Sequence, residues 1–520
     1  MTTTQNILFI MADQFRADHL GCEGHPYLKT ANLDALAKRG VRFSRAFVNS
    51  GVCGPSRMSY YTGRYPSSHG TTWNRVPLSV GEVTFGEYLA QARRDLVLAG
   101  KTHVIPDLAG MKRLGIEGDS ELGYLLARGG FRELDRYDGH HPPGVESGYP
   151  AYLKRQGYLS DDPWTDFVIA GQLPDGQLVS GWNMRNTYLP ARVAEAHSET
   201  AYMTNQALEF MRVQGDKPWV LHLSYVKPHW PYMAPAPYHN RYTAEQCLPV
   251  VRSEAERRDA HPVVAAYRQH EESQNFSRDE CIRTVRPAYQ GLIQQLDDHL
   301  GRLFEYMDGA GLMKNTLIVF TSDHGDLLGD HWLGEKELFY DAVQRVPCIV
   351  MDPDARADTT RGSVDDRFVE AVDMVPTFLE ALGVAGAPER IEGRSLLALT
   401  RGEPTLWRDA VFSELDYSFR QARLLLNKTP QQSRAYSLRT ARWRYVYWLD
   451  EPEQLFDLEN DPNELNDLGR EALHASTREA LRTQLLEALA RRKRRVTMSD
   501  EAVERGTNAH KRAGVFFGQW

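Results

Sequence analysis

The stretch LIVFTSDHGD, residues 317–326, joins a short apolar run to a cluster of ionisable side chains. Three other runs have the same form: ILFIMA (7–12) before Asp13-Gln14, LVLAG (96–100) before Lys101-Thr102-His103, and WVLHLSYV (219–226) before Lys227-Pro228-His229. Each run is too short and too rich in β-formers for a helix, which is typical of a buried strand. Because ligands bind at the carboxyl ends of strands in open α/β sheets, these polar residues predict one shared site.

A fifth run, VPCIVM (346–351), and the amphipathic segments between the runs complete an α/β pattern. Apolar residues from Tyr289 to Met307 recur at helical spacing, which predicts a helix over about 283–308, ended by Gly-Ala-Gly. After about residue 375 the sequence becomes turn-rich and aromatic. We expect an α/β domain over 1–375, with a large, mainly parallel sheet flanked by helices. A smaller subdomain over 376–520 should contain an antiparallel sheet and a helix.

The composition excludes several classes of protein. The chain has 520 residues and a net charge of −8, which gives no general attraction to nucleic acid or to an anionic membrane. The apolar run near the start has only six residues and lacks a basic leader, so we expect neither a signal peptide nor a membrane anchor. The five cysteines are far apart and form no CxxC pair: Cys22, Cys53, Cys247, Cys281 and Cys348. This spacing argues against a disulfide framework and against a zinc cluster, and it favours a cytoplasmic location for the protein.

The final residues, GVFFGQW (514–520), contain two Phe and one Trp. If they were free, they would expose a large apolar surface. We therefore expect this tail to dock on its own core or on a neighbouring subunit, and we expect a homo-oligomer.

The strand ends offer ligands for a metal ion. Asp13, Gln14, Asp323 and His324 supply two carboxylates, one amide oxygen and one imidazole. This oxygen-rich set suits one divalent cation such as Ca²⁺, Mn²⁺ or Mg²⁺ better than structural zinc, and it does not choose among the three. The competing interpretation is that Asp13-Gln14 and Asp323-His324 only cap turns and form ordinary hydrogen bonds in loops.

Cys53 lies between two glycines in GVCGPSRMSYYTGRYPSSHG (51–70), just before a helix-like run. As a metal ligand, a thiol is soft and matches hard oxygen ligands poorly. As a thiolate nucleophile, Cys53 would be stabilised by a helix that begins near Pro55, and a small buried residue is the ordinary alternative. Composition and spacing do not decide whether Cys53 is a metal ligand, a nucleophile or a buried structural residue.

A set of cationic and hydrogen-bonding residues accompanies the metal ligands: Arg57, Lys101, His103, His229, Lys336 and the neutral Asn74. Such groups around a divalent cation would stabilise a tetrahedral oxyanion and a leaving-group oxygen, as sulfuryl or phosphoryl transfer requires. Each of them also has an ordinary explanation as a surface charge or a loop contact.

Cys53-Gly54-Pro55-Ser56-Arg57 followed by Thr62-Gly63-Arg64 resembles the C-x-P-S-R-x-x-x-x-T-G-R signature of the type I sulfatases, in the alkaline phosphatase superfamily. Residues 6–43, 321–350 and 455–468 also resemble segments of that family, and the weakest match lies between 105 and 200. The resemblance implies an alkaline phosphatase-like fold. It also implies that a formylglycine-generating enzyme oxidises Cys53 to formylglycine, whose hydrated aldehyde is the nucleophile.

The resemblance further implies a role for each site residue. Formylglycine at position 53 would join Asp13, Gln14, Asp323 and His324 around the metal, and Arg57 would hold the attacking hydroxyl. Lys101 and His103 would bind the transferred group, and His103 would take the proton from the second hydroxyl. His229 and Lys336 would stabilise the leaving oxygen.

Two subfamily patterns are mixed in this chain. Asp13-Gln14, Asp323-His324 and Asn74 resemble phosphonate monoester hydrolases, and the first two pairs also resemble choline sulfatases, whereas Lys101-Thr102-His103 resembles arylsulfatases. Common arylsulfatases have Asp-Asp and Asp-Asn at the positions of these two pairs. The resemblance therefore implies one carboxylate fewer in this site, which would make the metal a stronger Lewis acid. We predict an arylsulfatase-like hydrolase of small sulfate monoesters that also accepts phosphonate monoesters and phosphodiesters, with substrate choice set within 105–200 and 230–280.

Three alternatives remain open at this point. Phosphonate monoester or phosphodiester hydrolysis could be the main activity. A non-catalytic relative with unmodified Cys53 could bind oxyanions. A phosphotransferase could use the Cys53 thiol, which the signature favours least.

Overall fold

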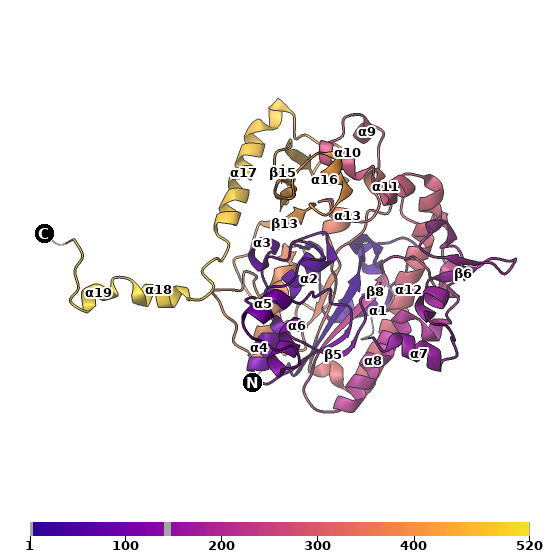
Figure 1. Ribbon diagram of the computed structural model, residues 1–520, viewed down its shortest axis with the longest axis horizontal. Coiled ribbons are helices and arrows are strands. Elements are labelled where there is room, and N and C mark those ends of the chain that lie inside the picture. Colours follow the sequence, from indigo (N-terminus) through magenta and orange to yellow (C-terminus); the bar gives the residue numbers. More distant parts are fainter. Residues whose placement is uncertain (1–3, 140–146, 519) are drawn as a thin grey trace.

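The computed structural model describes residues 4–139, 147–518 and 520. Its central sheet has eight strands in the order β11-β2-β10-β9-β1-β8-β4-β5 (Figure 1). Their bounds are β1 Asn6–Asp13, β2 Val41–Phe43, β4 Leu96–Gly100, β5 Phe131–Arg136, β8 Val220–Pro228, β9 Thr316–Ser322, β10 Cys348–Met351 and β11 Val364–Asp365. Strands β9, β1, β8, β4 and β5 are parallel, and β10 is antiparallel to β9 and β2. The predicted fold class is confirmed.

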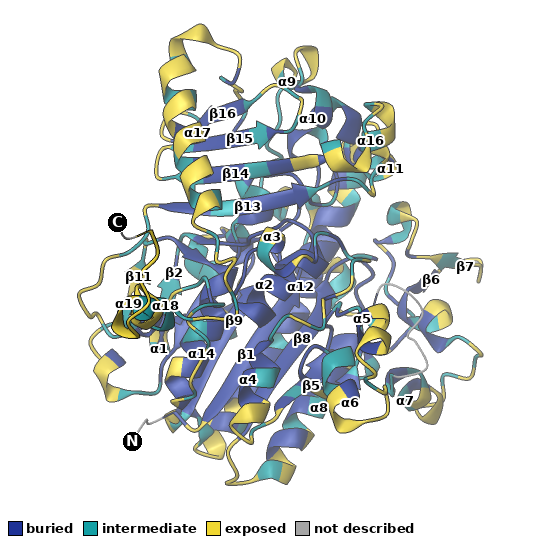
Figure 2. Cartoon of the chain, turned by 60° about the vertical axis from the view of Figure 1, so that its left-hand side comes forward, coloured by how far each residue is buried: buried dark blue, intermediate teal, exposed yellow. Residues whose placement is uncertain are grey.

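Helices cover both faces of this sheet, because side chains of each strand alternate between the two faces. Along β1, Leu8 and Ile10 belong to the core under α1, α8 and α12, whereas Ile7 and Phe9 belong to the core under α2, α4 and α14. The helix bounds are α1 Ala31–Arg39, α2 Cys53–Thr62, α4 Phe85–Gln91, α8 Glu199–Gln214, α12 Asp279–Gly309 and α14 Met374–Leu382. Figure 2 shows the strands buried between these layers.

The four strands with polar ends are neighbours in the sheet, in the order β9-β1-β8-β4. All four are parallel, so their carboxyl ends lie at one edge. The pairing of β1 with β8 shifts between Ala12 and Asp13, where Asp13 comes to lie opposite Pro228. The predicted meeting of these strand ends is confirmed.

The long helix α12 contains the predicted segment 283–308 and begins earlier, at Asp279. It ends at Gly309, and Gly311 adopts a left-handed φ of 71°. The helix packs against α1 and α8. No helix in the described part of the chain has the length and apolar composition needed to span a membrane.

The C-terminal part contains an antiparallel sheet in the order β13-β14-β15-β16, with α17 along it, as predicted (Figure 2). The bounds are β13 Ala410–Asp416, β14 Arg434–Thr440, β15 Trp443–Trp448, β16 Gln454–Asp457 and α17 Ala475–Ala490. The predicted division at residue 375 falls inside α14, whose Phe378 packs with β1 of the main sheet. That division stays a prediction.

Beyond α17 the chain leaves the body of the molecule through α18 (Asp500–Gly506) and α19 (Ala509–Arg512) (Figure 1). Phe517 is 79% exposed, and Trp520 is also exposed; residue 519 lies outside the described residues. The expectation that this tail docks on its own core is therefore wrong, because the extended segment carries it away from both sheets. Docking on a neighbouring subunit, and with it the homo-oligomer, stays a prediction.

Packing of α12 against the sheet should supply much of the stability of the main domain. Leu296 of α12 is fully buried, so Leu296→Ala removes apolar contacts and leaves a cavity. We expect the free energy of unfolding to fall by about 2–5 kcal/mol, seen as a lower urea midpoint by circular dichroism. Leu486→Ala in α17 is the matched control, because that leucine is largely exposed, and an equal loss in both variants would contradict this role of α12.

Candidate active site

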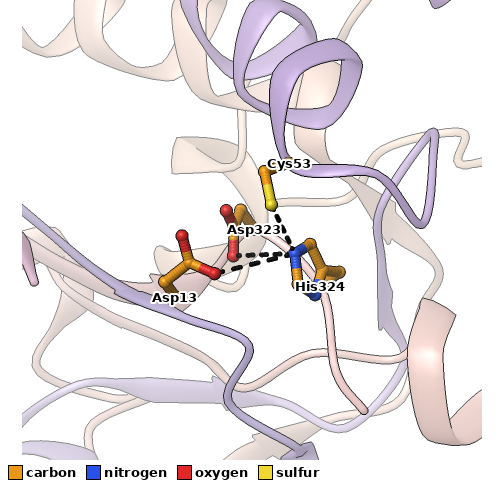
Figure 3. A group of neighbouring side chains, drawn as sticks. All are labelled: Asp13, Cys53, Asp323 and His324. Atoms are coloured by element: carbon orange, nitrogen blue, oxygen red, sulfur yellow. Dashed lines mark hydrogen bonds and ion pairs between the residues drawn. The ribbon is translucent and has the colours of Figure 1, made fainter. Parts of the chain in front are cut away.

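Four buried side chains gather at the carboxyl edge of the sheet (Figure 3). Asp13, Cys53, Asp323 and His324 each offer one ligand atom, and these atoms lie within 4.8 Å of one another. Asp13 comes from the end of β1, Cys53 begins α2, and the other two follow β9. Four of the five predicted metal ligands are thus brought together.

The two oxygens of Asp13 have different surroundings. Oδ2 accepts hydrogen bonds from Arg57 Nη2 at 3.1 Å and from Lys101 Nζ at 2.6 Å. Oδ1 is buried without a hydrogen bond in the described part of the chain, and it lies 3.7 Å from His324 Nε2. Burial favours the neutral acid, but Lys101, His229 and Arg57 outweigh it and hold the pKa of Asp13 well below its ordinary value. An anionic oxygen without a partner is where a cation fits.

The His324 ring turns Nε2 towards Cys53 and Asp323. Its Nδ1 donates to the carbonyl of Gly325 at 2.8 Å, so the lone pair is on Nε2. Nε2 lies 3.0 Å from Cys53 Sγ and 3.7 Å from Asp323 Oδ1. Burial, which outweighs the Asp323 charge, lowers the pKa of His324, so the neutral form that binds metals predominates.

Gln14 connects the metal side of the site to Lys336. Its backbone has a left-handed φ of 65°, and its backbone N–H donates to Asp323 Oδ1 at 3.1 Å. The side-chain oxygen accepts from Lys336 Nζ at 3.1 Å, while the NH₂ group donates to Tyr232 Oη at 3.0 Å and to Asp326. An amide oxygen has two lone pairs, so the one bond from Lys336 is compatible with metal ligation. That ligation stays a prediction.

Cys53 is held by the first turn of α2. The Gly54 N–H donates to Asn74 Oδ1 at 2.7 Å, and a Cβ at Gly54 would lie 2.9 Å from Asn74 Cα, so the close approach requires glycine. Helix α2 ends at Thr62, and Gly63 caps it with a left-handed φ of 67°. Burial raises the pKa of the Cys53 thiol to about 11. An unmodified Cys53 is therefore a protonated thiol at neutral pH, which argues against a thiolate nucleophile.

Arg57, one helical turn after Cys53, is fully buried between the carboxylates. Its Nε donates to Asp323 Oδ2 at 2.8 Å, and its Nη2 donates to Asp13. Its Nη1 donates to the Lys101 carbonyl at 2.9 Å and to Ser224 Oγ at 2.8 Å. In this arrangement Arg57 holds the carboxylates of Asp13 and Asp323 in place, and its contact with the attacking hydroxyl stays a prediction.

His229 and Lys336 form a buried pair on another side of the site. Lys336 Nζ donates to His229 Nε2 at 3.1 Å, and His229 Nδ1 donates to the Trp230 carbonyl at 2.7 Å. His229 Nε2 lies 3.9 Å from Asp13 Oδ1, which places the pair beside the metal ligands. This proximity suits the predicted role of stabilising a leaving oxygen.

His103 lies in the loop after β4 with a left-handed φ of 58°. The loop is held by Asp138, whose Oδ1 accepts from the Thr102 N–H at 2.9 Å. Lys101, at the start of this loop, directly contacts Asp13. The structure therefore places Lys101 of the predicted Lys-x-His pair against Asp13, and the proton-accepting role of His103 stays a prediction.

Three residues of the site were missed by sequence reasoning: Ser224, Tyr232 and Asp326. Ser224 lies within the apolar run of β8, where only its polarity gives a signal. Asp326 lies in the polar cluster after β9, where its residue type alone does not indicate a role, and Tyr232 lies in an irregular loop. Tyr232 Oη donates to Asp326 Oδ2 at 2.6 Å, so both belong to the hydrogen-bond network around Gln14.

Comparison with known proteins identifies the family. The Sulfatase family profile matches residues 5–384, and the profile "N-sulphoglucosamine sulphohydrolase, C-terminal" matches 329–491. The multifunctional alkaline phosphatase superfamily protein PehA of Trinickia caryophylli is 33% identical, with 91% of this chain and 93% of the relative covered. An arylsulfatase of Clostridium perfringens is 28% identical, with 89% and 90% covered.

The fold gives the same assignment. The phosphonate monoester hydrolase of Silicibacter pomeroyi superposes with a TM-score of 0.84 at 28% identity, covering 96% of this chain and 98% of that one. The family profile spans the main sheet and all four residues of the buried cluster. The chain therefore belongs to the sulfatase family of the alkaline phosphatase superfamily and is an enzyme of the sulfuric ester hydrolase class.

Proposed function

We propose that this enzyme is a metal-dependent hydrolase of small sulfate monoesters that uses a formylglycine made from Cys53. The observation that carries the proposal is the buried cluster in which Cys53, at the start of the signature helix, faces Asp13, Asp323 and His324. Sγ marks the position that the oxygens of a hydrated aldehyde would take. Hard oxygen at this position would complete a ligand set of carboxylates and one imidazole.

Asp13, Gln14, Asp323, His324 and the modified residue 53 would hold one divalent cation, Ca²⁺, Mn²⁺ or Mg²⁺. Asp13 Oδ1, which has no hydrogen bond among the described residues, and the lone pair of His324 Nε2, which faces Cys53 Sγ at 3.0 Å, support this fit. When bound, the metal would supply Lewis-acid activation of the nucleophilic oxygen and of the transferred group.

The chain's own residues position the groups that react. Arg57 fixes Asp13 and Asp323 relative to α2, so the nucleophile at position 53 stays aligned with the ligands. The Lys101 ammonium, 2.6 Å from Asp13 Oδ2, binds the anionic oxygens of the transferred group. His103 accepts the proton that regenerates the aldehyde. Lys336 and His229 stabilise the leaving oxygen.

Charge explains why several ester classes fit one site. A sulfate monoester, a phosphonate monoester and a phosphodiester each have a tetrahedral centre and one negative charge at neutral pH. The buried cations Arg57, Lys101 and Lys336 act on that charge in the same way for all three. We infer that the enzyme accepts phosphonate monoesters and phosphodiesters as secondary substrates.

A second candidate is a phosphonate monoester hydrolase as the main activity. The observation in its favour is the pair Gln14 and His324 at positions where common arylsulfatases have Asp and Asn. The structural similarity to the Silicibacter pomeroyi phosphonate monoester hydrolase also favours it. Lys101 and His103 favour the sulfatase.

Oxidation of Cys53 should be required for turnover. We expect Cys53→Ala to lower kcat/KM for an aryl sulfate by more than about 10³-fold, because the nucleophile is lost. Peptide mass spectrometry of active enzyme should show the aldehyde in place of the thiol at position 53. Cys348→Ala, which removes a buried thiol in β10, is the control and should stay active. Active protein with an unmodified Cys53 would contradict the mechanism.

Asp13 should be required for metal binding. We expect Asp13→Asn to bind the divalent cation at least about 10-fold more weakly, because the unpartnered anionic oxygen becomes a neutral amide. Metal per chain, measured by inductively coupled plasma mass spectrometry after dialysis, checks this. Asp308→Asn changes an exposed carboxylate paired with Arg39 and should keep the metal. Full occupancy in Asp13→Asn would remove Asp13 from the ligand set.

Relative kcat/KM separates the two candidate activities. On fully modified enzyme we expect a higher kcat/KM for an aryl sulfate than for the phosphonate monoester of the same phenol. The shared leaving group isolates the preference for sulfur or phosphorus, and Cys53→Ala supplies the background rate. A large preference for the phosphonate would reverse the order of the candidates.

A further inference from the structure

A cavity of about 220 Å³ adjoins the leaving-group side of the active site. We define it by six of its residues: Trp182, Trp230, Tyr232, Glu271, Phe276 and Glu335. Trp230 follows His229 in the chain, and their rings stack with centroids 5.4 Å apart at 16°. Glu335 precedes Lys336, which contacts His229. The walls of the cavity are thus continuous with the pair that faces the leaving oxygen.

Aromatic rings form much of the cavity wall. Trp182 and Trp230 meet edge to face, with centroids 4.9 Å apart at 76°, and Tyr232 meets Phe276 at 6.4 Å. Trp182 follows the hairpin of β6 (Ala170–Gln172) and β7 (Leu178–Ser180). A Cβ at Gly181 would lie 2.2 Å from Met233 Cγ, so glycine allows the close packing that brings Trp182 over the cavity.

The cavity can hold one ring or one compact apolar group. An apolar cavity of roughly 150 Å³ in a protein interior binds benzene, so about 220 Å³ also accommodates a substituent. A larger hollow of about 820 Å³ shares Trp182, Met184, Glu271 and Asn275 with the cavity, so the two spaces are neighbours. Because Trp230 stacks on His229, a leaving group held by His229 and Lys336 would lie next to the cavity.

Three carboxylates line the cavity: Glu271, Glu272 and Glu335. Glu335 is half-buried, Glu271 is exposed, and the positive charges of Lys336 and Arg420 act on Glu335. The nearby cations have other partners: Lys336 donates to Gln14 and His229, and Arg420 pairs with Glu272 and Glu337. An aromatic wall with carboxylates is suited to a cation, because ring faces and anions attract it together.

We propose that this cavity is a leaving-group subsite for esters whose alcohol or phenol has an apolar body and a positively charged amine. The transferred group stays at the metal ligands, and the cationic end lies between the tryptophans and Glu335. This inference rests on the proposed function, because the cavity adjoins the leaving oxygen only if His229 and Lys336 face it.

A pair of aryl sulfates of equal shape tests the subsite. One has a 2-(trimethylammonio)ethyl group in the para position, and the other has the neutral 3,3-dimethylbutyl group. We expect kcat/KM on fully modified wild-type enzyme to be about 2- to 30-fold higher for the cationic ester, the range of a cation on aromatic faces. The ratio of the two values is the readout.

Comparing this ratio between the wild type and cavity variants removes any intrinsic difference in reactivity between the two esters. We expect the cationic-to-neutral ratio to fall towards one in Glu335→Gln and in Trp182→Ala. Glu305→Gln, which removes an exposed carboxylate of α12, is the charge-matched control and should keep the wild-type ratio. A ratio of one in the wild type, or an unchanged ratio in both cavity variants, would overturn the subsite while leaving the proposed function intact.

A different result would contradict the proposed function. If fully modified enzyme hydrolyses neither ester, the sulfatase proposal fails, and the cavity is then tested by binding alone. Calorimetry with phenyltrimethylammonium on the Cys53→Ala protein should show a complex that Glu335→Gln weakens. Absence of binding would overturn the subsite as well.

Discussion

The buried guanidinium of Arg57 is the interaction on which the rest of the site depends. Asp13 and Asp323, from neighbouring strands β1 and β9, would repel each other without it, and an uncompensated buried charge costs several kcal/mol. The same side chain donates to Ser224 of β8 and to the Lys101 carbonyl after β4. One residue thus joins four strands to α2, the helix that begins with Cys53. The hydrogen bonds of Arg57 therefore position both the proposed metal ligands and the proposed nucleophile.

The local charge explains how a chain with a net charge of −8 can bind anions. Arg57, Lys101 and Lys336 oppose the carboxylates of Asp13 and Asp323 in the buried cluster. A divalent cation would make this region more positive, and a monoanionic ester would compensate part of that charge. Because Asp13 Oδ2 is occupied by Arg57 and Lys101, only its Oδ1 is open towards a cation.

The sequence predicted the strands and the residues at their ends, because apolar runs bounded by polar clusters are local signals. Because parallel pairing alone aligns the carboxyl ends of strands, it is enough to place Asp13, Lys101, His229 and Asp323 at one edge of the sheet. Ser224 and Tyr232 could not be predicted, because their roles depend on contacts across the sheet and on an irregular loop. For the tail, the sequence predicted docking on its own core or on a neighbouring subunit, and only the first is wrong, because apolar composition indicates burial without identifying the surface that provides it.

The hydrogen bonds of Gln14 explain why an amide suits this position. Its NH₂ group donates to Asp326 and to Tyr232, while its oxygen accepts from Lys336. A carboxylate could accept from Lys336 but could not donate, and it would face the Asp326 carboxyl at close range. Burial already raises the pKa of Asp326, so a further negative charge there would be costly. Gln14 and Asp326 are therefore a matched pair. Through Gln14 and Tyr232 this network connects Asp323 to the aromatic cavity, so in the proposed mechanism the same few residues would position the reacting centre and the leaving group.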